Sequence, residues 1–507
     1  MIKLRASVKP LDLSIIVAYL AAMAGIGFYF MRRNRNVDAY FKAGGHLPWW
    51  AVSLSIYATM CSSLTFMGSP GLMYAGNVTY AVLAFGIPAL AYVTVKWYLP
   101  FFRRLNLTSA YEYLEVRFNL PCRLFASAAF ILFMVVRTGV VAYLPALAVC
   151  AVTGLDVNVA IVAVTAITIL YCTVGGVEAV IWSDVVQSVI LFVSAVLILV
   201  WLVVGTDGGW GGVLSMGKSA GLFRVFDFAM DWTRPCFWVV LVGGLVANLA
   251  SYTSDQCVVQ RYMTTRNEQE AARSIVFNGW LSFFNCILFF AIGVALWTYY
   301  HSDVAGRILP EGTKPDAVIA VFIARELPVG ISGLVLAAVA AATMSTLSAN
   351  LNAAASAITT DFYRRLGAAG RRRRTEEGKI HCTTAPSDSD ARLLLCGKVS
   401  TVVVGLLGGA MALWLANADI GNVYIQFQRF LGILTAGLGC LFFMGIFMKR
   451  VNGFGATCGL VANYVVSFAL DQLDFAGKPH LLLYGFLGMV ACLIVAPIAS
   501  FLKGKTK

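Results

Sequence analysis

Residues 58–71 have the sequence ATMCSSLTFMGSPG, and they lie inside an apolar segment that extends over residues 47–74. Their hydroxyl side chains stand next to Gly68, Pro70 and Gly71, residues that weaken a helix locally and leave backbone carbonyl groups unpaired. Broken helices of this kind line binding sites at the middle of a membrane. Close packing of small residues between two helices would also explain the composition.

The surrounding sequence consists mainly of long apolar segments. Of 507 residues, 59% are hydrophobic and only 12% are charged. A helix needs about 20 apolar residues to cross the hydrocarbon layer, and helices satisfy their own backbone groups there. We therefore predict an all-α polytopic membrane protein with about 13 transmembrane helices. The expected spans are residues 11–31, 47–74, 79–102, 124–150, 156–174, 182–204, 233–256, 274–300, 328–362, 396–416, 422–448, 454–472 and 480–502.

An odd number of spans places the two termini on opposite sides of the membrane. The loops on the side of the C-terminus carry most of the Lys and Arg residues, including the arginines of residues 32–35, 103–104 and 371–374. By the positive-inside rule, the N-terminus is outside and the C-terminus is cytoplasmic, in the plasma (inner) membrane. The net charge of +13 is thus explained by topology. It does not indicate nucleic-acid binding.

A second polar stretch lies in the ninth segment, where residues 340–352 have the sequence AAATMSTLSANLN. Ser345, Thr346 and Ser348 fall within one helical turn, and Ala342 precedes them by three residues. Hydroxyl and carbonyl oxygens without a fixed charge suit a sodium ion. Together with the broken second segment, this stretch predicts a sodium site, although a polar helix seam would give the same pattern.

Charged residues within the apolar segments are a third feature. Arg137 lies near the centre of its span, where an arginine costs about 2.5–3.5 kcal/mol unless it finds a partner. It could pair with Asp184 or with a carbonyl-rich helix end, or it could clamp a substrate carboxylate. Asp184 itself could be interfacial or could guide a cation. Arg429 enters its span from outside and either reaches toward the interface or touches substrate.

The sequence lacks the motifs that are typical of several other function classes. No phosphate-binding Gly-x-x-x-x-Gly-Lys-Ser/Thr loop is present, and the four histidines are scattered, so the sequence does not indicate an ATPase or another enzyme. The twelve cysteines show no Cys-x-x-Cys spacing that would suggest zinc. An ion channel remains the alternative from a different class.

Several local motifs carry a resemblance to a known family. They are residues 38–41 (DAYF) with 47–51 (LPWWA), 108–115 (TSAYEYLE), 175–178 (GGVE) with Trp182 and Asp184, 258–262 (VVQRY), and 448–450 (MKR). On the basis of these motifs, the chain resembles the sodium:solute symporter family, most closely its bacterial sodium/sialic acid branch. The resemblance extends from about residue 11 to residue 503.

This resemblance implies a LeuT-type fold made of two inverted five-helix repeats. The expected parts are an extra N-terminal helix and loop (1–46), a first repeat (47–204), a second repeat (205–448) and two C-terminal helices with a cytoplasmic tail (449–507). A basic cytoplasmic loop is expected at residues 363–395, within the second repeat.

The resemblance also implies the cation sites. The principal sodium ion would be held by the carbonyls of Ala58, Cys61 and Ala342 and by the hydroxyls of Ser345 and Thr346. A possible second sodium site would use Asp184, Ser345 and Ser348, and Ala349 stands where this branch has a further serine.

The substrate site implied by the resemblance matches in part. Arg137 stands at the carboxylate clamp, and Ser62, Ser63 and Thr65 are expected substrate contacts. Met60 and Ala84 replace hydrogen-bonding residues of the branch. We therefore expect a sodium-coupled symporter that imports a small anionic or sugar-like solute, namely sialic acid or a related organic acid. A sodium/sugar or sodium/monocarboxylate symporter is the alternative.

Overall fold

The structure is a computed structural model that describes residues 10–31, 37–76, 78–105, 108–153, 155–302, 308–310, 312–313, 315–367, 388–418 and 423–503. Within these ranges all regular structure is helical, apart from one isolated bridge between Leu47 and Thr265. The expected basic loop lies mostly outside the described residues, as does the side chain of Arg429.

The helices follow the predicted apolar segments closely. Most span ends lie close to the expected position, because the length of an apolar segment fixes the length of the helix that crosses the membrane. The larger differences are the helix starts at Asp388 and Glu268, expected at 396 and 274, and the helix end at Met263, expected at 256. The longer helices are α1 (Pro10–Phe30), α3 (Trp49–Met60), α4 (Ser63–Tyr74), α8 (Leu120–Thr153), α9 (Val157–Gly205), α10 (Gly209–Ser219), α11 (Phe237–Thr253), α13 (Glu268–His301), α15 (Ile331–Ala357), α16 (Asp388–Asn417), α17 (Val423–Phe447), α18 (Gly453–Gln472) and α19 (Tyr484–Leu502).

Shorter helical elements complete these spans and connect them. A single span over Val78–Leu105 is assembled from four consecutive pieces. The pieces of this span and the remaining short elements are α2 (Val37–Lys42), η2 (Ala43–Gly45), η3 (Val78–Ala84), α5 (Gly86–Val93), η4 (Thr94–Tyr98), α6 (Leu99–Leu105), α7 (Glu112–Arg117), α12 (Gln256–Met263), η5 (Pro315–Ala317), α14 (Val318–Arg325), η6 (Ile358–Arg364) and η8 (Leu481–Leu483).

Two of the spans are broken, and one long helix contains a kink that separates two spans. The pair α3 and α4 bends by 58°, and the pair α11 and α12 bends by 46°. The described residues contain 10 helices that are long and apolar enough to cross a membrane, or 12 with these two pairs. Helix α9 has 49 residues and bends at Gly176, whose φ of 60° and ψ of −164° suit only glycine. Counting α9 as two spans gives the expected 13.

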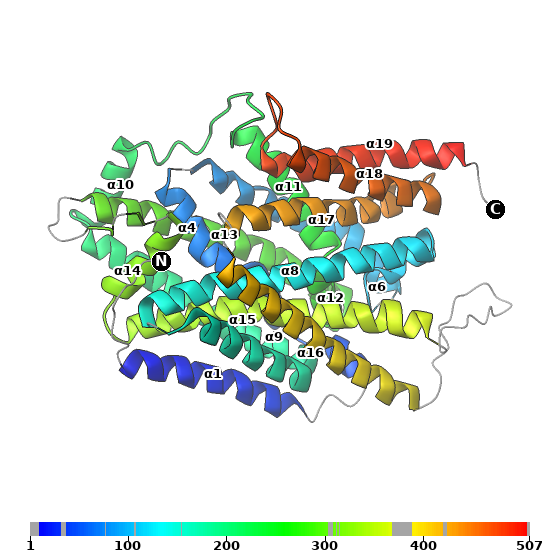
Figure 1. Cartoon of the computed structure of the whole chain (residues 1–507), viewed down its shortest axis with the longest axis horizontal. Helices are drawn as coiled ribbons and strands as arrows, with labels where there is room; N and C mark the ends of the chain where they lie inside the picture. Colours follow the sequence, from blue (N-terminus) through cyan, green and yellow to red (C-terminus); the bar gives the residue numbers. More distant parts are fainter. Residues whose placement is uncertain are drawn as a thin grey trace.

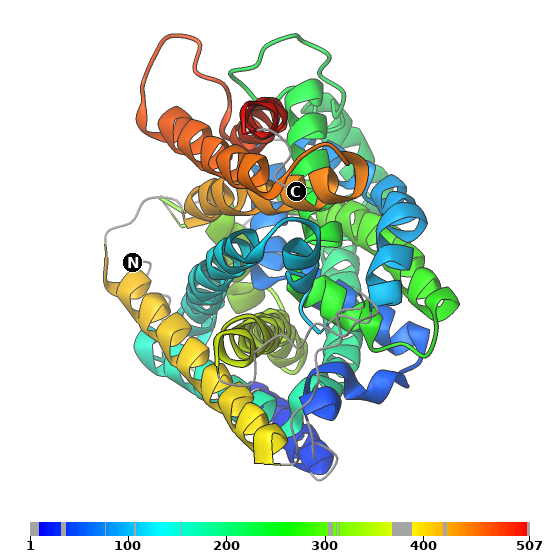
Figure 2. The ribbon, with the colours of Figure 1, turned by 90° about the vertical axis from the view of Figure 1, so that its right-hand side faces the viewer.

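Helix α15 lies at the centre of the bundle. It packs against α9, α8, α16 and α1, as the two ribbon views show (Figures 1 and 2). Nearly all of its side chains are buried. Its sequence is rich in alanine and serine, and such small residues let neighbouring helices approach closely. The polar residues of α15 are therefore held away from lipid and face other helices.

The extra helices lie on opposite edges of the bundle, with α1 along one edge and α18 and α19 along the other (Figure 1). Helix α1 is attached to α15 by Asp12, whose carboxylate accepts the N–H groups of Gly330 (2.7 Å) and Gly333 (3.0 Å) and the hydroxyl of Ser332 (2.8 Å). These donors stand at the start of α15, where helical N–H groups lack internal partners. Helix α1 is thus anchored to the central helix.

The packing of α1 against α9 gives a stability prediction. A Cβ atom added at Gly27 would lie 2.5 Å from Cβ of Tyr171, whereas one added at Gly25 meets nothing within 4 Å. We expect Gly27→Leu to lower stability by about 1–3 kcal/mol because it overpacks a helix contact. Gly25→Leu, two residues away, should leave the melting temperature of the purified protein nearly unchanged. Equal melting temperatures for the two variants would contradict this packing.

Candidate functional site

The break between α3 and α4 exposes two backbone carbonyls. Cys61 and Ser62 have non-helical dihedral angles, and the N–H of Ser62 donates to the carbonyl of Met60 at 3.1 Å. In a continuous helix that N–H would bond to the carbonyl of Ala58. The carbonyls of Ala58 and Thr59 accept hydrogen bonds from other helices instead. The local sequence thus produces acceptors at the middle of the bundle.

These carbonyls meet the hydroxyl cluster of α15. The hydroxyl of Ser345 donates to the carbonyl of Ala58 (2.9 Å) and lies 3.2 Å from that of Ala342. The hydroxyl of Thr346 lies 3.2 Å from the carbonyl of Ala342 and 3.4 Å from that of Thr59. Oxygens without a fixed charge therefore converge in a fully buried place. This is the donor set that a sodium ion requires.

Cys61, the fifth expected sodium ligand, stands directly at the end of α3. Its sulfur accepts a hydrogen bond from Asn285 on α13 at 3.5 Å. Its carbonyl has no described contact with the hydroxyls of α15. The structure thus joins Ala58, Ala342, Ser345 and Thr346 by hydrogen bonds and adds the carbonyl of Thr59, which the sequence reasoning did not select.

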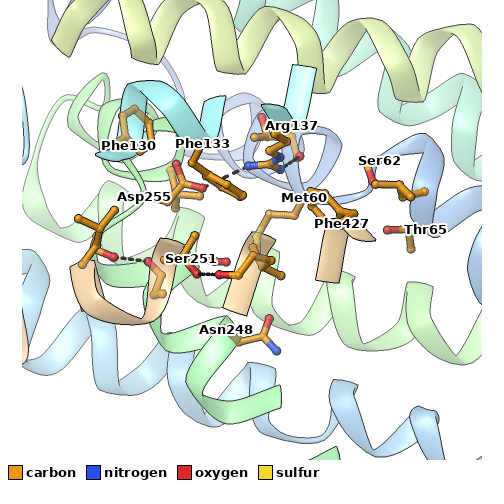
Figure 3. Close-up of a pocket in the computed structure, with 18 of the residues that line it drawn as sticks. Met60, Ser62, Thr65, Phe130, Phe133, Arg137, Asn248, Ser251, Asp255 and Phe427 are labelled. Atoms are coloured by element: carbon orange, nitrogen blue, oxygen red, sulfur yellow. Dashed lines mark hydrogen bonds and ion pairs between the residues drawn. The ribbon is translucent and has the colours of Figure 1, made fainter. Parts of the chain in front are cut away.

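A cavity opens beside both helix breaks. It is lined by α3 and α4, by α8, by α11 and α12, and by α17 (Figure 3). Its polar wall carries hydroxyl, amide and charged groups, and its apolar wall carries aromatic and aliphatic side chains. The lining residues are Thr59, Met60, Ser62, Leu64, Thr65, Ser69, Phe130, Phe133, Arg137, Asn248, Ala250, Ser251, Ser254, Asp255, Val258, Phe427, Leu431, Thr435 and Leu438.

Arg137 links the two helix breaks across this cavity. Its Nη1 lies 3.3 Å from Oδ2 of Asp255, at the start of α12, and its Nη2 donates to the carbonyl of Thr59 at 3.2 Å. Figure 3 shows the guanidinium between Asp255 on one side and Met60 and Ser62 on the other. Among the described residues, the carboxylate that contacts Arg137 belongs to Asp255, so the expected pairing with Asp184 is wrong. The other expected structural partner, a carbonyl at a helix end, is present, because Thr59 stands in the last turn of α3.

The structure brings some of the expected substrate contacts together and not others. Met60, Ser62 and Thr65 line the cavity with Arg137. The hydroxyl of Ser63 is buried and donates to the carbonyl of Val141 at 3.2 Å. Ala84 is buried at the end of η3 and is not among the lining residues.

Sequence reasoning missed the wall formed by α11, which supplies Asn248, Ser251, Ser254 and, just beyond its end, Asp255. A signal for Asp255 was present. It is a carboxylate inside the predicted span 233–256, and such intramembrane charges mark functional sites.

Asp184 is fully buried between helices. Its Oδ2 accepts the hydroxyl of Ser55 and lies 3.0 Å from Nη2 of Arg261, which is also fully buried. Its Oδ1 has no partner among the described residues. The hydroxyl of Ser348, another residue of the possible second sodium site, donates to the carbonyl of Ser345 at 2.9 Å. The pair of Asp184 and Arg261 therefore joins α9 to α12.

Two broken helices that face a polar cavity beside a buried oxygen cluster define a membrane transporter with a midplane binding site. The sequence model of the "Sodium:solute symporter family" matches residues 40–462. The chain belongs to this family, whose members are transporters and not enzymes.

Similar proteins cover nearly the whole chain. The "Sodium/sialic acid symporter SiaT" of Proteus mirabilis is 33% identical over 97% of this chain and 95% of its own length. The "Sodium/sialic acid symporter NanT" of Aliivibrio fischeri is 35% identical over 96% and 92%. The "Sodium/glucose cotransporter" of Vibrio parahaemolyticus is 28% identical over 91% and 84%.

A solved structure also matches closely. It is described as the substrate-bound outward-open state of a Na+-coupled sialic acid symporter with a novel Na+ site, and it covers 98% of this chain and 99% of its own. The sequence identity is 33% and the TM-score is 0.89. The expected LeuT-type fold with inverted repeats is thereby confirmed.

Proposed function

We propose that this protein is a sodium-coupled secondary active symporter that imports a small carboxylated solute by alternating access. Sialic acid, as N-acetylneuraminate, or a related organic acid is the proposed solute. The observation that carries this proposal is the guanidinium of Arg137, which faces a polar cavity between two broken helices. The two sialic acid symporters, which match over almost the full chain, support the choice of solute by the function in their names.

The solute would bind with its carboxylate at Arg137 and its polar groups near the hydroxyls of Ser62 and Thr65. The side chain of Met60 lines the same cavity and offers no strong hydrogen bond. A hydroxyl of the solute left unpaired there would cost about 1–3 kcal/mol. This supports a related acid as well as sialic acid, and a sugar or a monocarboxylate remains the alternative solute.

Sodium would bind between α3 and α15, held by the carbonyls of Ala58, Cys61 and Ala342 and by the hydroxyls of Ser345 and Thr346. Sodium and solute would then both stabilise the same arrangement of these helices, which is the physical basis of coupling. A second sodium ion near Asp184, Ser345 and Ser348 is also part of the proposal. The unpartnered Oδ1 of Asp184 supports it.

The orientation is proposed from the charges, with the N-terminus outside and the C-terminus in the cytoplasm of the inner membrane. A green fluorescent protein fused after Lys507 should fluoresce in bacterial cells, because it folds in the cytoplasm. Alkaline phosphatase fused at the same position should be inactive. The opposite pair of results would reverse the proposed topology.

The solute assignment predicts a specific loss of binding. In proteoliposomes with an inward sodium gradient, we expect concentrative uptake of labelled N-acetylneuraminate, and none with potassium in place of sodium. Arg137→Gln should weaken binding at least tenfold, because removing the charged partner of a carboxylate costs about 2–5 kcal/mol. Arg224→Ala, which removes an exposed arginine, serves as the control.

Uptake by Arg137→Gln with unchanged affinity would disprove the carboxylate clamp. If the wild type takes up no N-acetylneuraminate but is stabilised in sodium by another acid or a sugar, the symporter stands and sialic acid is discarded.

The sodium site predicts a change in cation dependence. Ser345→Ala combined with Thr346→Ala removes both hydroxyls that face the carbonyls of Ala58 and Ala342. We expect the sodium concentration for half-maximal uptake to rise at least tenfold, because two of the proposed oxygen ligands are lost. Thr343→Ala on the same helix is the matched control, since its hydroxyl bonds only to the carbonyl of Val339. An unchanged sodium activation curve in the double variant would refute the assignment.

A further inference from the structure

Arg137 already has a carboxylate partner within the protein. Asp255 lines the same cavity, and its Oδ2 lies 3.3 Å from Nη1 of Arg137. The proposed function, on which this inference rests, brings a second carboxylate to the same guanidinium. The position of Asp255 next to Arg137 therefore affects which solutes the site selects.

The pairing of Arg137 is incomplete. Each of its contacts uses a single nitrogen, one with Asp255 and one with the carbonyl of Thr59, and its buried Nε has no partner among the described residues. Arg123 on the same helix differs. Its Nε (2.9 Å) and Nη2 (2.7 Å) both donate to Asp361, and its Nη1 contacts Glu115.

Arg123 is thus saturated by closely spaced carboxylates, as expected of a structural arginine. Arg137 has a single carboxylate partner at longer range, and that partner is also engaged elsewhere. Oδ1 of Asp255 accepts the backbone N–H of Cys257 at 2.8 Å and so caps α12. The guanidinium keeps donor capacity, and Asp255 is held at its side.

We propose that Asp255 competes with the carboxylate of the solute for Arg137 and thereby sets the affinity and charge selectivity of the site. A solute carboxylate at Arg137 lies close to that of Asp255, so two negative charges share one positive charge. Like charges in a partly buried site repel each other strongly. Asp255 therefore weakens the binding of acids and eases their release.

The same competition links binding to movement. Arg137 on α8 holds α12 through Asp255 and α3 through the carbonyl of Thr59. A solute carboxylate that shares Arg137 with Asp255 weakens this contact between α8 and α12. The Thr59 carbonyl also lies 3.4 Å from the hydroxyl of Thr346 in the oxygen cluster. The solute, through Arg137, and sodium, through Thr346, thus both act on the backbone of Thr59.

Asp255→Asn separates the charge from the structural role of this residue. Asparagine is as good a helix cap as aspartate, so its side-chain oxygen can still accept the N–H of Cys257. Asp156→Asn is the matched control, because Asp156 caps α9 through the N–H groups of Asn158 and Val159 and does not line the cavity.

The test is a ligand titration of the purified full chain in sodium buffer, in which the rise in melting temperature reports binding. N-acetylneuraminate and acetate are the probes, with chloride at equal ionic strength as the reference. We expect Asp255→Asn to bind both carboxylates about tenfold more tightly than the wild type, because a like charge is removed. Asp156→Asn should match the wild type. In an Arg137→Gln background, Asp255→Asn should give a much smaller gain, because competition for Arg137 is then absent and only the general repulsion between the carboxylates is removed.

Unchanged or weaker carboxylate binding by Asp255→Asn would overturn the proposal and make Asp255 a support for Arg137. An equally large gain without Arg137 would overturn it as well, because the effect would then be general charge repulsion and not competition for Arg137. Acetate keeps the result independent of the natural solute. If the wild type shows no response to N-acetylneuraminate, sialic acid fails as the solute, whereas the acetate titration still decides the role of Asp255.

Discussion

The structure depends on the rule that backbone polar groups must find partners inside an apolar medium. The break between α3 and α4 violates this rule locally, since the carbonyls of Ala58 and Thr59 lose their helical partners. Ser345, Thr346 and Arg137 satisfy them from α15 and α8. The hydroxyl-rich stretches of the apolar segments are therefore placed at the centre of the bundle, enclosed by helices whose small residues allow close packing.

Buried charges join the helices that the breaks create. Arg137 connects α8 to both broken spans, and the fully buried pair of Asp184 and Arg261 connects α9 to α12. A buried ion pair contributes little net stability because desolvation offsets its attraction, but breaking it leaves an uncompensated charge. Such pairs are thus better suited to specifying an arrangement of helices than to stabilising the fold, and they suit a protein that changes between arrangements.

The spans, the broken second segment and the hydroxyl cluster could be predicted from the sequence, because each depends on composition within one segment. Contacts between segments could not. Asp255 lies 118 residues from Arg137 in the sequence. Nothing in the sequence around either residue indicates that their helices are neighbours. The position of Asp255 inside an expected span marks it as a candidate, but the sequence does not name its partner. Likewise, the orientation of Ser63 away from the cavity depends on the helix rotation after the break, which sequence does not specify.

The charges in the cavity constrain how loading can work. Arg137 and Asp255 cancel each other, so the cavity without solute carries no net charge from this pair. On the proposed assignment, a monoanionic solute adds one negative charge and the principal sodium ion adds one positive charge. The loaded centre is then neutral, which lowers the free energy of enclosing it in a poorly solvated site. A second sodium ion near Asp184 would make loading electrogenic, so the membrane potential would contribute about 2.3 kcal/mol per 100 mV. Solute binding at the first site would then be electrically neutral. Sodium binding at the second site would carry the net charge on which the membrane potential acts to drive accumulation.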